Sequence, residues 1–226
     1  TRIENIRALS IQNDIRPAGS FECSNPVLNR IHDAAARTWR ALMLSGMPTD
    51  SWRERFGTGL IQNCEAAFYW SSMGAFYTKW LQDLREGHRP DGYRLRSGGP
   101  IAYAYWWPNW GKNGVILVPW LMYLHYGDQH AVADNYPAMK QWLNLCIPPD
   151  DSGRTWQPPA DHGIAEAGYG DHGRPTARWY DAHTGDLFET LHMLHCFQMA
   201  EQMAILLGQT QDALLYASVQ ARFRDK

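Results

Sequence analysis

The sequence contains no uninterrupted apolar segment long enough to cross a membrane. Its longest apolar run, Val115 to Leu124, has ten residues and includes Pro119, whereas a membrane-spanning helix needs about 20. Neither sign of charge dominates, because 21 basic and 23 acidic residues leave a net charge of -2. Binding to nucleic acid or to an anionic membrane would require a basic surface. The sequence therefore predicts no nucleic-acid partner and no membrane partner.

Several signatures of common chemistry are also absent. The four cysteines lie far apart without a C-x-x-C pair, so free buried thiols are expected rather than disulfides. No glycine-rich loop joins a strand to a helix and no G-x-S-x-G occurs, which argues against nucleotide binding and a serine-hydrolase elbow. We expect no cofactor. The sequence begins with Thr1 and lacks a basic segment followed by an apolar one, so we expect it to start within a longer protein or after processing.

Aromatic residues are abundant, with 11 Trp and 11 Tyr in 226 residues. More than half of the tryptophans fall between the predicted helices: Trp52, Trp106, Trp107, Trp110, Trp156 and Trp179. A tryptophan ring offers a flat apolar face with a polar edge, which suits the binding of a sugar ring. The alternative is that these rings only fill gaps over the rim of a helical barrel.

Six segments have the apolar spacing or the capping residues of helices. They are residues 25–44, 66–84, 113–126, 130–146, 185–207 and 211–224. Asn25 followed by Pro26 marks the start of the first, and Gly127 with Asp128 predicts a turn between the third and fourth. Residues 1–23 are predicted to be a strand or linker from a preceding β-domain. We expect an all-α fold of helical hairpins with long loops at one end, which indicates an α/α toroid.

The densest polar cluster lies between the first two predicted helices, at residues 48–57. If this stretch is helical, Asp50 and Glu54 share one face at a spacing of four residues. Two carboxyl groups beside Trp52 suggest a glycosidase, in which one acid protonates the leaving oxygen and another carboxylate activates water or attacks the sugar. Ser51 and Glu54 also match a helix capping box, which would make the motif structural. Arg53 is a further consideration, because a neighbouring cation favours the ionised carboxylate whereas a general acid needs a raised pKa.

Histidines raise the question of a metal site. His192, His195 and Cys196 lie close together in the helix predicted at 185–207, and three Asp-His steps precede it: Asp161-His162, Asp171-His172 and Asp181-x-His183. Their spacing fits no standard zinc pattern. His195 falls on the predicted apolar stripe of its helix, so we expect it in the core with a hydrogen-bond partner. The sequence predicts no metal site.

An ordered series of motifs resembles one family. The first motif is Gly19-x-Phe21-x-Cys23-Ser24-Asn25-Pro26-x-Leu28-Asn29-x-Ile31, and the second consists of Pro48-Thr49-Asp50 with Arg53-Glu54-Arg55. The later motifs follow in this order: Trp110-Gly111, Pro119-Trp120, Tyr126-Gly127-Asp128, Tyr136-Pro137-x-Met139-x-x-Trp142, Tyr169-Gly170-Asp171 and Ala204 through Leu207-Gly208. Over residues 15–226 the chain is similar to the catalytic domain of family 78 glycoside hydrolases, the α-L-rhamnosidases.

The resemblance implies an (α/α)6 barrel that hydrolyses terminal α-L-rhamnosyl groups with inversion. It places Glu54 as the general acid and Asp50 as a residue that holds sugar hydroxyls, and it implies a rhamnose-containing glycoside or oligosaccharide as substrate. The expected catalytic residues are thus Glu54 and Asp50, and the expected substrate-binding residues are Trp52, Arg53, Trp106, Trp110, Asp171 and His172.

The resemblance also implies that residues 24–226 are the N-terminal half of the barrel. Twelve helices of about 12 residues with loops need well over 300 residues. The family's general base is a Glu in the second half, so we expect it beyond Lys226, with the remaining helices and accessory β-domains as partners. The isolated chain is expected to be inactive and to self-associate through apolar stripes that carry Trp70, Trp80, Trp120 and Trp142.

Two alternatives stay open at this point. The family motif carries a Trp and a second Asp after Gly57, where this sequence has Thr58-Gly59-Leu60, and Asp50 to Glu54 is one residue short of the usual spacing. A non-catalytic carbohydrate-binding relative would fit these differences. A related toroid hydrolase or lyase acting on uronic acids would use cations to neutralise the substrate carboxylate, for which Arg53, Arg55, Arg94 and Arg96 are candidates.

Overall fold

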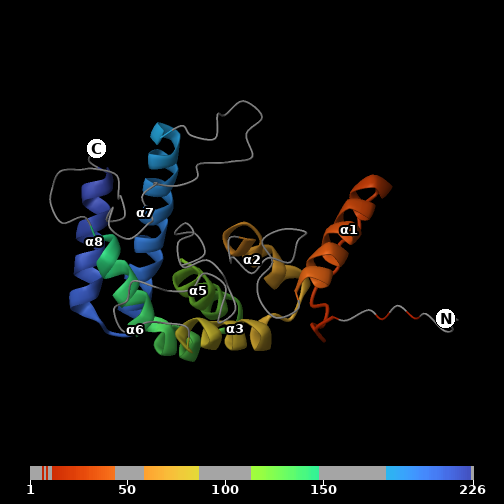
Figure 1. The fold of residues 1–226 in the computed structure, drawn as a ribbon, viewed down its shortest axis with the longest axis horizontal. Helices are drawn as coiled ribbons and strands as arrows, with labels where there is room; N and C mark the ends of the chain where they lie inside the picture. Colours follow the sequence, from red (N-terminus) through yellow and green to blue (C-terminus); the bar gives the residue numbers. More distant parts are fainter. Residues whose placement is uncertain are drawn as a thin grey trace, which may run out of the picture.

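A computed structural model describes residues 7, 9, 12–43, 59–86, 113–147 and 182–224. These residues form seven helices (Figure 1): α1 (Pro26–Leu42), α2 (Gly59–Trp70), α3 (Gly74–Glu86), α5 (Gly114–Tyr126), α6 (Gln129–Cys146), α7 (Ala182–Leu206) and α8 (Thr210–Arg224). Within the described ranges the extended pairing is limited to an isolated bridge between Pro17 and Ser71. The prediction of an all-α fold is confirmed.

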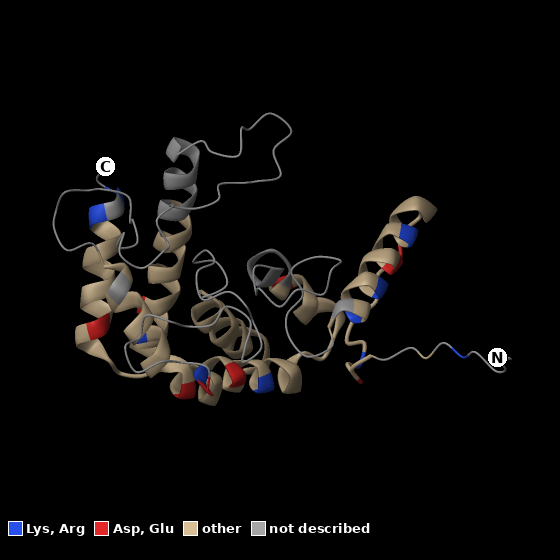
Figure 2. Ribbon diagram, viewed as in Figure 1, with Lys and Arg blue, Asp and Glu red and all other residues tan. Residues whose placement is uncertain are grey.

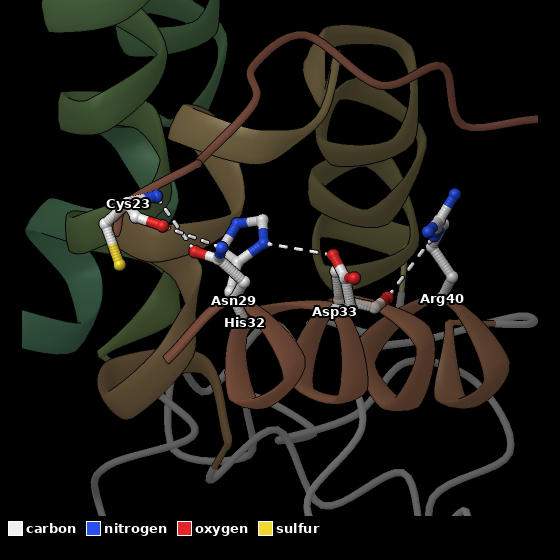
Figure 3. A network of polar contacts seen from close by, with 6 residues as sticks. Cys23, Asn29, His32, Asp33 and Arg40 are labelled. Carbon is white, nitrogen blue, oxygen red and sulfur yellow. Dashed lines mark hydrogen bonds and ion pairs between the residues drawn. The ribbon is translucent and has the colours of Figure 1, made fainter. Parts of the chain in front are cut away.

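The start of α1 follows from its sequence. Asn25 caps the helix by accepting a hydrogen bond from the backbone N–H of Val27 at 2.9 Å, and Pro26 occupies the first turn. Within the first turn of α1, the side chain of Asn29 contacts Cys23, which precedes the helix. It accepts a hydrogen bond from the backbone N–H of Cys23 and donates one to the backbone carbonyl of Cys23, both at 2.9 Å (Figure 3). These reciprocal bonds hold the incoming chain against the first turn of α1. The helix start at Asn25-Pro26 is the one that the sequence predicted.

The helix predicted over 66–84 is wrong, because the structure breaks it between α2 and α3. The N–H groups that would continue α2 have acceptors elsewhere: Ser72 donates to the carbonyl of Arg16 at 2.8 Å, and Met73 donates to the hydroxyl of Tyr126 at 2.9 Å. Apolar residues keep helical spacing across the break, so periodicity alone could not reveal it. The described part of the chain therefore has seven helices instead of the six predicted.

Short turns join the remaining pairs. Gly127 ends α5 with a left-handed φ of 67°, and Asp128 caps α6 by accepting from the N–H of Ala131 at 3.1 Å. Gly208 adopts a φ of 70° between α7 and α8. Glycine occupies the left-handed region without a Cβ penalty, so both positions allow a tight reversal. Figure 1 shows α7 and α8 side by side as an antiparallel pair.

Two apolar clusters form the core, and α5 contributes to both. Val115 and Ile116 belong to a cluster with side chains from α6, α7 and α8, whereas Leu121 and Met122 pack with α1, α2 and α3. This double role explains why α5 is apolar around most of its circumference. It lies in the middle of the described helices (Figure 1).

Two of the four tryptophans expected on exposed stripes are fully buried, and the other two are partly buried. Trp80 and Trp142 are 1% and 2% exposed, and Trp70 and Trp120 are partly buried against the core clusters. The exposed apolar side chains of the helices are smaller and lie mainly on α1, α7 and α8: Val27, Leu28, Ile31, Leu191, Ile205, Leu214 and Leu215. The tryptophan stripes thus serve packing between neighbouring helices within the chain.

Charged residues of both signs are interspersed along α1 and α3. On α1, Asp33 lies among Arg30, Arg37 and Arg40, and acidic and basic residues also alternate on α3 (Figure 2). None of the described helices is both long and apolar enough to span a membrane.

Candidate active site

The residues predicted to bind substrate or to catalyse its cleavage belong to three stretches that join helices: 44–58, 87–112 and 148–181. All of them lie outside the described residues, as do the six tryptophans singled out between predicted helices. The predicted site residues concerned are Asp50, Trp52, Arg53, Glu54, Trp106, Trp110, Asp171 and His172. The described helices show what frames these stretches.

Long and short connections alternate along the chain. Turns at 71–73, 127–128 and 207–209 close the pairs α2–α3, α5–α6 and α7–α8. The three stretches that carry the predicted site residues each connect the C-terminal end of one helix to the N-terminal end of the next: α1 to α2, α3 to α5, and α6 to α7. Short turns between described helices thus alternate along the sequence with the stretches 44–58, 87–112 and 148–181.

Ring contacts fix the relative direction of α2 and α5. Phe68, near the end of α2, stacks on His125 with ring centroids 4.6 Å apart and also contacts Tyr126, at 5.4 Å. Both partners belong to the last turn of α5. The first residue of α3, Gly74, lies against the same Tyr126 ring. The C-terminal ends of α2 and α5 therefore lie together, and the N-terminal end of each points away from the short turns.

The N-terminal end of α5 meets α6 and α7 through a buried polar contact. Asn113, 0% exposed, accepts a hydrogen bond from the indole N–H of Trp142 at 2.8 Å. Its amide nitrogen lies 3.8 Å from the sulfur of Met193. These contacts place three features at one end of the molecule: the start of α5, which follows stretch 87–112; the end of α6, which precedes stretch 148–181; and the N-terminal half of α7. The sequence pattern predicted Asn113 only as the start of a helix. The signal for a further role is a polar residue directly before a strongly apolar helix.

The histidines of α7 differ from their prediction. His195 is exposed rather than buried, because the inward face of α7 is formed by Met193, Cys196 and Phe197. The largely buried histidine is His192, whose Nε2 lies 3.7 Å from the sulfur of Cys196. Burial, together with the charge of His195, lowers the pKa of His192 to about 4. Among the described residues, no group of three or more His, Cys, Asp or Glu side chains is placed to hold a metal ion.

Comparison with known families identifies the chain. Residues 16–226 match the sequence model of the bacterial α-L-rhamnosidase six-hairpin glycosidase domain. The chain belongs to this family. Its helical hairpins are accordingly those of a six-hairpin toroid, and the family resemblance predicted from the motifs is confirmed.

Individual relatives agree with this assignment. An α-L-rhamnosidase of Streptomyces avermitilis is 33% identical over 218 residues, which are 90% of this chain and 19% of the relative. One from Formosa agariphila is 30% identical over 189 residues, which are 77% of this chain and 18% of the relative. The chain thus spans about a fifth of the length of the curated relatives that it matches.

Solved structures show the same helical arrangement. The α-L-rhamnosidase from Dictyoglumus thermophilum superposes with a TM-score of 0.76 at 23% identity, covering 93% of this chain and 23% of that one. The Streptomyces avermitilis α-L-rhamnosidase complexed with L-rhamnose gives a TM-score of 0.73 at 27% identity, covering 94% and 19%.

Proposed function

We propose that residues 24–226 are the N-terminal half of the catalytic barrel of an inverting glycoside hydrolase that removes terminal α-L-rhamnosyl groups. The family match over residues 16–226 carries this proposal. A relative that is 33% identical over 90% of the chain is an α-L-rhamnosidase. The substrate is then a rhamnose-containing glycoside or oligosaccharide, and the remaining helices and accessory β-domains complete the enzyme.

In the proposed reaction Glu54 is the general acid. Its carboxyl group donates a proton to the glycosidic oxygen while the bond between this oxygen and the anomeric carbon breaks. A carboxylate on the opposite face takes a proton from the water that attacks the anomeric carbon. Such pairs are separated by about 6.5 to 9.5 Å to leave room for the water. We assign this base to a glutamate outside residues 1–226.

The other predicted residues bind the sugar. Asp50 accepts hydrogen bonds from ring hydroxyls, and Arg53 donates hydrogen bonds to the sugar. Trp52, Trp106 and Trp110 offer ring faces to the apolar side of the sugar. Asp171 and His172 would complete the polar contacts from the third stretch.

A second candidate is a non-catalytic domain that binds the same sugars. It is favoured by Thr58-Gly59-Leu60, which stands where the resemblance leads one to expect a Trp and a second Asp. Gly59 is the first residue of α2 and Leu60 the second, so two of these three residues belong to the first turn of that helix. Turnover by the full-length protein separates the two candidates.

Glu54→Gln in the full-length protein tests the assignment. We expect hydrolysis of an aryl α-L-rhamnoside to fall about a hundredfold or more with an unchanged melting temperature, because proton donation is lost while a capping hydrogen bond can persist. Glu65→Gln is the matched control, since Glu65 is an exposed glutamate on α2 whose carboxylate accepts a 3.4 Å hydrogen bond from the hydroxyl of Tyr69. A lower melting temperature with full turnover would instead establish the capping-box role of Glu54. For an inverting enzyme, NMR of the first product must show β-L-rhamnose.

A protein comprising residues 1–226 alone tests the location of the base. We expect it to be inactive, because the second carboxylate is missing, and to self-associate through the exposed apolar side chains of α1, α7 and α8. A monomeric, active protein would place the base within these residues, where Asp161, Asp171 and Asp181 would be the first to test.

A further inference from the structure

Asn113 stands at a helix start without capping the helix. It directly precedes α5, yet its side chain makes no capping hydrogen bond. Asparagine is favoured at this position because its oxygen accepts an N–H of the first turn. Asn25 and Asp128 do so for α1 and α6. The polar atoms of the Asn113 side chain are used for contacts outside its own helix.

Those contacts join three helices among buried side chains. The oxygen of Asn113 accepts from the indole of Trp142 on α6 at 2.8 Å, and its amide nitrogen faces the sulfur of Met193 on α7 at 3.8 Å. All three residues are at most 2% exposed. A buried donor or acceptor that loses its partner is strongly unfavourable, because water cannot replace the lost hydrogen bond. The contact therefore fixes the position of Asn113 relative to both neighbouring helices.

The position of this contact connects it to the proposed site. Asn113 is the first described residue after the stretch 87–112 and lies three residues after Trp110. Trp142 lies four residues before the end of α6, which precedes the stretch carrying Asp171. Met193 belongs to α7, which follows that stretch. One side chain thus joins the helices to which two of the three stretches are attached.

We propose that Asn113 is a positioning residue of the active site. By holding the start of α5 against α6 and α7, it fixes the helix end that follows the stretch carrying Trp110 relative to the two helices that flank the stretch carrying Asp171. Asn113 itself does not touch substrate. This inference rests on the proposed function. Its physical basis is that catalysis requires sub-ångström placement, and a misplacement of about 1 Å can cost about a hundredfold in rate.

Asn135 offers a matched control for the test. It is also a buried asparagine, 1% exposed. Its oxygen accepts from Arg85 of α3 at 2.8 Å, and its amide donates to the carbonyl of Ala131 at 2.7 Å. It lies seven residues before Trp142 on α6, about 10 Å farther from the loop-bearing end. Asn135→Leu therefore removes a comparable buried contact away from the proposed site.

Kinetics of the full-length protein compare the two substitutions. We expect Asn113→Leu to lower kcat/KM for an aryl α-L-rhamnoside about tenfold or more, and Asn135→Leu to change it less than twofold, with similar losses of melting temperature. Trp142→Phe removes the same hydrogen bond from the other side while keeping an aromatic ring. Its kinetic effect should overlap with that of Asn113→Leu, so the double variant loses less than the product of the two single effects. Equal kcat/KM for the Asn113 and Asn135 variants, or independent effects of Asn113 and Trp142, would overturn the proposal.

Hydrogen exchange distinguishes failure of this inference from failure of the proposed function. The N–H groups of Ile116 and Leu117 donate to the backbone carbonyl of Asn113 at 2.9 and 3.0 Å. We expect these amides to exchange faster in Asn113→Leu than in Asn135→Leu, whatever the substrate. If the unaltered protein does not hydrolyse rhamnosides, the proposed function fails, while equal exchange in the two variants would overturn the anchoring role separately.

Discussion

Removal of Asp212 should weaken the junction between α6 and α8 more than removal of either of its partners. Asp212 lies in the first turn of α8 and is 8% exposed. It accepts from the hydroxyl of Tyr136 at 2.9 Å and from the ammonium of Lys140 at 2.7 and 2.8 Å. Burial raises the pKa of Tyr136, and the hydrogen bond to Asp212 raises it further, so the phenol remains a donor.

The expected magnitudes follow from the exposure of each partner. Asp212→Ala leaves the buried hydroxyl of Tyr136 without its acceptor, which costs about 1 to 3 kcal/mol. It also removes a helix-dipole interaction of about 0.3 to 1 kcal/mol. The Lys140 side chain is 44% exposed, so its ion pair adds at most about 1 kcal/mol. We expect about 3 kcal/mol for Asp212→Ala, about 1 kcal/mol for Tyr136→Phe or Asp212→Asn, and less than about 1 kcal/mol for Lys140→Met.

Thermal and urea unfolding of the full-length variants provide the measurement. The order of the destabilisations is the decisive result, because it depends on which partner is buried. A Lys140→Met effect as large as that of Asp212→Ala would show that the ion pair, rather than the buried hydroxyl, dominates. An Asp212→Ala effect below about 0.5 kcal/mol would refute the reasoning altogether, because every buried-polar penalty used above exceeds it.

Two further predictions concern the titratable side chains of the core. The pKa of His192 is lowered to about 4 in the fold from about 6.5 in an unfolded chain; the unfolded state therefore binds the proton more readily, and stability should fall by up to about 3 kcal/mol as pH drops from 6.5 to 4. Melting curves against pH should be flatter for His192→Gln, and an identical slope would contradict this. A thiol reagent should modify Cys23 first in the native protein, because Cys64, Cys146 and Cys196 are 0% exposed and burial raises the pKa of Cys64 to about 12. Mass spectrometry that finds any of the buried three modified before unfolding would be the contrary result.

Local chemistry determined most helix boundaries. Asn25 with Pro26 starts α1 because side-chain capping and a fixed proline φ act within a few residues. Gly127 with Asp128 ends one helix and caps the next for the same kind of reason. The ordered motifs were sufficient to predict the family, because they extend over most of the chain and require no knowledge of contacts.

The candidate site could be predicted only in part. The pairing of Asp50 with Glu54 is visible in the sequence as a spacing of four residues. The partner carboxylate that the proposed inverting reaction would require is assigned to another part of the fold, which no local pattern identifies. The contact of Asn113 with Trp142 is likewise invisible in sequence, since 29 residues separate the two side chains.

Tertiary contacts decided the features that the apolar pattern predicted wrongly. Periodicity continues from Tyr69 to Met73, yet the chain turns there because Ser72 and Met73 find acceptors on distant segments. His195 lies on a stripe that suggested burial, but the packing of α7 against α8 selects the neighbouring face. A helical pattern states which residues share a face. Which face is buried depends on the helices that pack against it, and those are specified by residues far away in the chain.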